Sequence, residues 1–142
     1  MSPNVSPRVD EFVLALPLRS GLRVLEIGCG PGVAAREVLR RLGKGYVLAI
    51  DRSKRAVALA IKGAADEIAT GMLEFRCVAA EEFRLRPDDD RFDLAFAMRV
   101  GALDGRHPEL EGRVLQNLKS ALKPNGRLFI DGGSPLREIS LH

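Results

Sequence analysis

Apolar residues along this chain follow two spacings, and the two spacings alternate from one end of the sequence to the other. Near the N-terminus they recur every three or four residues, which is the spacing of one face of a helix. A short amphipathic helix is therefore predicted over residues 7–16, and its apolar positions are Val9, Phe12, Val13 and Leu16. Continuous apolar runs further on predict buried strands at 22–27, 46–50, 73–78, 92–98 and 127–130.

Helical spacing returns between these runs. Three more helices are predicted, at 32–42, from Ser53 to about Ala69, and at 109–122. The polar stretch 79–91 predicts a turn or one small helix, and residues 124–126 predict a turn. Strands separated by helices pair in parallel through right-handed crossovers. The sequence therefore predicts an α/β fold with a doubly wound, mostly parallel sheet and helices on both faces.

The composition fits one folded unit. The chain has 142 residues, of which 46% are hydrophobic and 29% are charged, and this is enough for a single buried core. We expect one domain over 1–142, with a helix or lid at 1–20, a core at 21–132 and a tail at 133–142. The N-terminus lacks the layout of a secretory signal, and no apolar run reaches the roughly 20 residues of a membrane span. A cytoplasmic location is expected.

The charge, the cysteines and the histidines exclude several classes of site. The net charge of +3 comes from scattered arginines, so it indicates a solvated surface and not a nucleic-acid site. Cys29 and Cys77 are placed at the ends of strands that are not neighbours, roughly 10 Å apart, which is too far for a disulfide. We therefore expect two reduced thiols. The two histidines, His107 and His142, stand alone, so no metal site is predicted.

The strongest chemical signal is the glycine-rich stretch after the first strand, Gly28-Cys29-Gly30-Pro31-Gly32. Glycine lets the backbone take positive φ and approach a ligand closely. The helix that follows presents free N–H groups and a partial positive charge, which suit a carboxylate or a phosphate. Because such turns also serve purely structural ends, the loop alone does not decide the function.

Asp51 favours the ligand interpretation. It ends the second strand, and ligands of open parallel sheets bind at the carboxyl ends of the strands, where the strand order reverses. An acid at this point accepts hydrogen bonds from ribose hydroxyls. The alternative is a helix cap, which Ser53 already provides. Loop and acid together indicate an adenosine-containing cofactor, and a dinucleotide fingerprint would need a small residue at Val33.

The stretch Val24–Gly32, with an acid at Glu26, resembles motif I of the class I (Rossmann-like) S-adenosylmethionine-dependent methyltransferases. The resemblance covers roughly residues 20–132 and continues through Ala49–Asp51, Ala80–Phe83, Phe92–Leu94 and Leu122–Leu128. It implies a Rossmann-like core of about five strands in the order 3-2-1-4-5. It also implies that S-adenosyl-L-methionine is the cofactor and that methyl transfer is the activity.

The resemblance implies a role for each matching residue. Glu26 would hold the ammonium group of the cofactor, Asp51 would bind the ribose, and Arg52 would flank the adenine. The backbone N–H of Ala80 would meet the adenine ring, with Glu81 replacing an aspartate that relatives often carry two residues earlier. The methionine part would lie against the loop and the end of the fourth strand, at Gly28, Cys29, Gly30, Gly32 and Met98.

Two departures from the family concern the acceptor side and the sheet edge. After the fourth strand, relatives often carry polar or aromatic residues that touch substrate, but this chain has Gly101 and Ala102. Beyond the fifth strand the C-terminal hairpin is missing or reduced, which would leave a bare sheet edge. We expect that the tail after Ser134 covers this edge, or that two chains pair there as a homodimer.

The sequence does not determine the methyl acceptor. A small molecule is favoured, a nucleic acid or a protein stays open, and no membrane partner is expected. A hydroxyl acceptor would benefit from a base, for which the candidates are Asp104, His107 and Glu109, while Arg99 would bind an acidic substrate or be solvated. Two other functions stay open: a non-catalytic methyltransferase-like binding module, and a nicotinamide-dependent oxidoreductase, for which the chain has little room.

Overall fold

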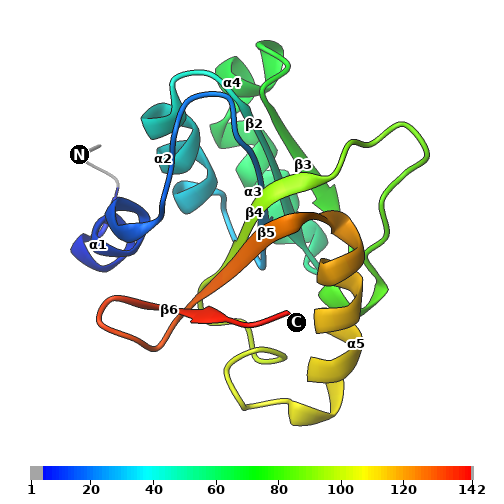
Figure 1. Ribbon diagram of the computed structural model, residues 1–142. Coiled ribbons are helices and arrows are strands. Elements are labelled where there is room, and N and C mark those ends of the chain that lie inside the picture. The colour runs from blue at the N-terminus through cyan, green and yellow to red at the C-terminus, as the bar shows by residue number, and fades with distance from the viewer. Residues whose placement is uncertain (1–4, 142) are drawn as a thin grey trace.

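The sheet of the computed structural model, which describes residues 5–141, has six strands in the order β3-β2-β1-β4-β5-β6 (Figure 1). Its first five strands in sequence are parallel, and only β6 is antiparallel to its neighbour. The α/β class and the order 3-2-1-4-5 are therefore confirmed. The strands are β1 (Arg23–Ile27), β2 (Tyr46–Asp51), β3 (Leu73–Cys77), β4 (Phe92–Ala97), β5 (Leu122–Asp131) and β6 (Leu136–Ile139).

Helices cover both faces of the sheet, and Figure 1 shows α5 on the opposite side from α1 and α2. One buried cluster joins α1, α2 and α3 to the sheet, and a second joins α5 and the segment after β3 to the other face. Because both faces are covered, the central strands are apolar without alternation. The helices are α1 (Pro7–Ala15), α2 (Val33–Leu42), α3 (Lys54–Gly63), α4 (Ala65–Ala69) and α5 (Pro108–Ala121), with a 3₁₀ turn η1 (Ala80–Glu82).

Helix α1 packs into the core. Its Phe12 is 1% exposed, and the ring centroid lies 5.9 Å from that of Phe96 on β4. On its polar side, Asp10 pairs with Arg41 of α2, and Arg41 also contacts the buried Glu37. Burial of one apolar face and an ion pair on its edge fix this helix against α2 and the sheet.

The C-terminal tail forms β6 and covers the edge of β5. Leu136 to Ile139 pair with Asp131 to Leu128 of β5 in antiparallel register. The sheet therefore has six strands where about five were predicted, and the C-terminal hairpin is present in a short form. Backbone pairing along an exposed edge satisfies N–H and C=O groups that would otherwise face water alone. The reason for expecting two chains to pair at β5 no longer holds.

Two elements differ from the prediction by more than one residue at a boundary. The helix expected from Ser53 to about Ala69 is divided at Gly63 and Ala64, where Ala64 has φ −122° and ends α3. Glycine favours such a break because its helix propensity is low. The turn expected at 124–126 lies inside β5, because Leu122 pairs with Phe92 and the register resumes only at Arg127. The intervening residues form an irregularity in the strand, as in a bulge.

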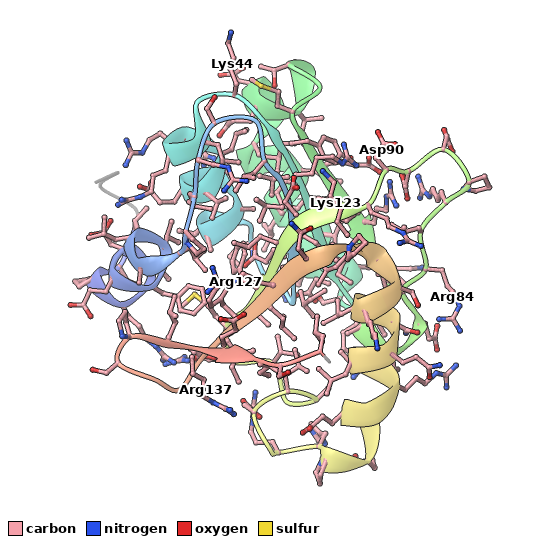
Figure 2. All side chains as sticks on the ribbon, viewed as in Figure 1. Lys44, Arg84, Asp90, Lys123, Arg127 and Arg137 are labelled. Carbon is pink, nitrogen blue, oxygen red and sulfur yellow. The ribbon has the colours of Figure 1, made fainter. Side chains whose placement is uncertain are left out.

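Charged side chains are spread around the molecule. In Figure 2, the labelled Lys44, Arg84 and Arg137 lie at widely separated places on the surface. Cys29 is buried, Cys77 is exposed, and both are free thiols, as predicted. Across residues 5–141, none of the helices combines the length and the apolar character that crossing a bilayer demands.

Replacing Gly32 with alanine is expected to destabilise the fold by about 2–4 kcal/mol. Gly32 precedes α2 with φ +88°, and a Cβ there would lie 2.9 Å from the Phe75 ring and 3.1 Å from Ala60. Gly21→Ala is a matched control, because Gly21 has φ +93° but no heavy atom within 4 Å of the added Cβ. It should lose only about 1–2 kcal/mol through backbone strain. Equal losses in urea unfolding would contradict the packing argument.

Candidate functional site

The glycine loop between β1 and α2 and the end of β2 are joined by hydrogen bonds. The N–H of Gly30 donates to Oδ2 of Asp51 at 2.8 Å, and the N–H of Cys29 donates to the carbonyl of Ile50 at 2.9 Å. The other carboxylate oxygen of Asp51 accepts the N–H of Ser53 at 2.8 Å. The structure therefore brings together the two features on which the cofactor prediction rests.

Asp51 keeps capacity for a ligand. Each of its two oxygens accepts one backbone hydrogen bond, and a carboxylate offers about four acceptor positions. Ser53 is the cap of α3, since its hydroxyl accepts the N–H of Ala56 at 3.1 Å. The backbone bonds hold the Asp51 carboxylate in one orientation at the carboxyl edge of the sheet.

Glu26 is a buried carboxyl group without a hydrogen-bond partner on one oxygen. It is 2% exposed, and its Oε1 has no partner among the described residues. Burial, with a smaller contribution from the negative charge of Asp51, raises the pKa of Glu26 to about 8. The pKa of the Cys29 thiol is also raised, first by burial and then by Glu26 and Asp51. A perturbed carboxyl in this position suits a cationic ligand group.

A cavity of about 230 Å³ lies beside these residues, over the carboxyl ends of β1, β2 and β4. It includes Gly28, Asp51, Arg52, Ala80 and Glu81 of the predicted cofactor set, together with Arg99 and His107 of the catalytic candidates. Its lining also includes Gly101 and Ala102, at the positions where relatives often carry residues that touch substrate. The rest of its apolar lining was not predicted from the sequence, and comprises Ile27, Ile50, Val78, Val100 and Leu110.

The other predicted cofactor residues lie outside the lining of this cavity: Glu26, Cys29, Gly30, Gly32 and Met98. Met98 packs against the cluster on the α1–α3 side of the sheet, the side that also contains Phe96 of β4. Side chains alternate between the two faces along a strand, so residues 96 and 98 share a face. The alternation of side chains along the strand could therefore have predicted from the sequence that Met98 lies on the same face as Phe96.

The segment after β4 folds over the glycine loop. A Cβ on Gly28, which has φ +71°, would lie 2.6 Å from Cγ2 of Val100. Arg99 takes the left-handed conformation with φ +56°, and its N–H donates to Asp131 at 3.0 Å while its carbonyl accepts from Arg106 at 2.7 Å. These bonds hold the backbone at Arg99 in a conformation that residues other than glycine rarely adopt.

The catalytic candidates differ in their surroundings. Asp104 forms an ion pair with Arg106 at 2.9 Å, and this contact lowers the pKa of Asp104, which makes it a weaker base. His107 lies at the cavity, packed against Gly101, and its Nδ1 is 3.5 Å from Oε1 of Glu109. Of the three candidate bases Asp104, His107 and Glu109, only His107 lines the cavity.

The family model described as "methyltransferase domain" matches residues 24–126. The ubiquinone biosynthesis O-methyltransferase of Bradyrhizobium diazoefficiens is 37% identical over 123 residues, which are 87% of this chain and 44% of that protein. The homologue named mitochondrial in Schizosaccharomyces pombe is 36% identical over 112 residues, 78% of this chain and 38% of that one. The chain thus spans less than half the length of these curated relatives.

Solved structures with a similar fold include enzymes of different names. The cyclase SpnF is 30% identical, with a TM-score of 0.70 over 86% of this chain and 42% of that one. An S-adenosylmethionine-dependent methyltransferase from Thiobacillus denitrificans, in complex with S-adenosyl-L-homocysteine, is 22% identical, with a TM-score of 0.68 over 88% of this chain and 48% of that one. The second likeness concerns the fold alone.

Proposed function

The chain belongs to the methyltransferase domain family, and from this premise we propose that it binds S-adenosyl-L-methionine and transfers its methyl group to a small-molecule acceptor. The observation that carries the proposal is the hydrogen bond from Gly30 to Asp51 beside the unpartnered, buried Glu26. A small acceptor is favoured because relatives at 37% and 36% identity are named for ubiquinone biosynthesis.

The residues present fit this cofactor. An unpartnered carboxyl oxygen on Glu26 suits its ammonium group, and the fixed carboxylate of Asp51 suits ribose hydroxyls. The η1 turn, through Ala80 and Glu81, would meet the adenine, and Arg52, which also lines the cavity, would flank it. Gly28, Cys29, Gly30 and Gly32 would serve the methionine part through their backbone.

When bound, the cofactor supplies an electrophilic methyl group on its sulfonium. The chain itself orients the reactants and excludes water, to which Val78, Val100 and Leu110 contribute as apolar walls of the cavity. For a hydroxyl acceptor, His107 is the side chain placed to take the proton, because it is the one of the three candidate bases that lines the cavity.

Calorimetric titration with S-adenosylmethionine, S-adenosylhomocysteine and a nicotinamide dinucleotide tests the proposal. We expect saturable binding of the first two and none of the third. A labelled-methyl assay with small phenols and hydroquinones, RNA and protein then identifies the class of acceptor. Nicotinamide binding without S-adenosylmethionine binding would assign the chain to the oxidoreductases instead.

A non-catalytic or otherwise non-methylating binding module is the second candidate. The likeness to the cyclase SpnF at 30% identity favours it, because that protein is named for another reaction. The plain Gly101–Ala102 stretch beside the cavity also favours it. Cofactor binding without methyl transfer to any acceptor class would support this candidate. The cytoplasmic location stays a prediction.

A further inference from the structure

Asn117 of α5 is a buried polar residue on an otherwise apolar helix face. It is 7% exposed, and its neighbours on this face are fully buried apolar residues of the same core cluster: Val114, Leu118 and Ala121. An apolar side chain at this position would suit the packing at least as well, since burying an amide is costly unless its hydrogen bonds are made. The position therefore needs an explanation beyond packing.

The amide of Asn117 makes all its hydrogen bonds to one short segment. Its Nδ2 donates to the carbonyl of Ala80 at 3.2 Å and to that of Glu81 at 3.0 Å. Its Oδ1 accepts from Nη1 of Arg84, a residue that lies beside α5 in Figure 2. One side chain thus anchors the η1 turn and Arg84, which lies two residues after it.

These carbonyls belong to the part of the chain that lines the cavity, since Ala80 and Glu81 both border it. A trans peptide unit is planar, with its C=O and N–H pointing in opposite directions. Fixing the two carbonyls toward α5 therefore also fixes the direction of the N–H groups of Glu81 and Glu82, of which the second donates to the carbonyl of Ala79 at 3.0 Å within the turn. The turn has backbone bonds of its own, since the N–H of Phe83 donates to the carbonyl of Ala80 at 3.3 Å. The amide of Asn117 adds to these bonds and ties the turn to α5.

We propose that Asn117 is a positioning residue of the cofactor site, which orients the η1 turn so that its backbone and side chains meet the adenine. This inference rests on the proposed function, because Asn117 acts on the same site indirectly, through its hydrogen bonds to the η1 turn. Asn117 itself does not line the cavity. Its effect is on the adenosine half of the ligand and not on the group held by Glu26.

The test compares Asn117→Leu, which removes all three hydrogen bonds, with Leu118→Ala at the next position of the helix. Leu118 is 0% exposed, so its truncation is expected to destabilise the protein by about 2–5 kcal/mol without altering the hydrogen bonds to η1. Binding of S-adenosylhomocysteine and of adenosine is measured by calorimetry well below the unfolding temperature of each variant. Asn117→Leu is expected to weaken both ligands at least tenfold, and Leu118→Ala is expected to retain the native affinities.

Two further variants divide the contacts. Asn117→Asp keeps the acceptor for Arg84 but sets a carboxylate against two carbonyls, so it is expected to weaken both ligands as much as Asn117→Leu does. Arg84→Met removes only the Arg84 contact and is expected to change affinity less than threefold. If Asn117→Leu does not fold, Asn117→Asp tests the same loss of affinity.

The outcomes separate this inference from the proposed function. Tight binding by the native protein with Asn117 variants within twofold of it would overturn the positioning role and leave the function intact. An equal loss in Leu118→Ala would also overturn it, because general destabilisation would then be the cause. Absence of binding by the native protein would remove the proposed function and this inference together.

Discussion

Glu26→Gln is expected to stabilise the cofactor-free protein at pH 8 and to weaken its binding of S-adenosylmethionine. The folded protein holds the proton of Glu26 up to a pKa of about 8, against 4.5 for the ordinary carboxyl. An unfolded chain releases that proton at lower pH, so the folded state binds more protons between these values. The contribution of Glu26 to stability is thus fully present below pH 4.5 and is lost as pH rises through about 8.

The size of this effect follows from proton linkage. Over the window between the two pKa values, the free energy of unfolding should fall by up to about 1.4 kcal/mol per pH unit because of this one group. A glutamine at position 26 carries no charge at any pH, so the variant should lose this slope. Urea unfolding of both proteins at several values from pH 5 to pH 8 measures the difference.

Binding should change in the opposite sense. The ammonium group of the cofactor favours the ionised carboxylate, so native affinity should rise with pH toward 8 and binding should release a proton. Calorimetry in two buffers of different ionisation enthalpy detects that proton. Native-like affinity in Glu26→Gln, or an unchanged stability slope, would contradict the assignment.

Glu37→Gln is the matched control for Glu26→Gln. Glu37 is also 2% exposed, but its carboxylate is bonded to Arg40 and Arg41, and the contact with Arg40 above all lowers its pKa. Its replacement should destabilise the protein by about 1–3 kcal/mol and leave cofactor affinity unchanged. The same substitution is therefore expected to stabilise the cofactor-free protein at position 26 at pH 8 and to destabilise it at position 37.

Asp51→Asn is expected to weaken S-adenosylhomocysteine binding by about 30- to 150-fold, which corresponds to about 2–3 kcal/mol. Asparagine retains one oxygen for the N–H of Gly30, so the loop should stay in place, but it loses the charge and one acceptor. Loss of this charge should also lower the pKa of Glu26, because Asp51 is one of the causes that raise it. Adenosine, which keeps the ribose, should lose affinity by the same factor.

Calorimetry with both ligands measures this loss, and Asp66→Asn is the control. Asp66 is an exposed aspartate on α4, away from the cavity, so its replacement should leave both affinities unchanged. An Asp51→Asn variant with native affinity would remove the ribose role and, with it, the main support for the cofactor.

Much of the fold was predictable because the signals are local. The order of strands and helices follows from the spacing of apolar residues, and the glycine loop and Asp51 were recognisable from the residues themselves. Parallel pairing then requires both to lie at one edge of the sheet. The boundary of α3 was missed because the break at Gly63 and Ala64 reflects a small difference in helix propensity.

The sequence by itself determined the α/β topology, the loop at 28–32 and the acid at 51, because spacing and residue type are properties of neighbouring positions. Only the tertiary structure decided that the tail pairs with β5, that Glu26 retains its proton, and that Asn117 anchors the η1 turn. Each of these depends on which distant groups exclude water from a site or supply a hydrogen bond there. Solvent exposure and long-range partners are set by the packed chain and not by local sequence.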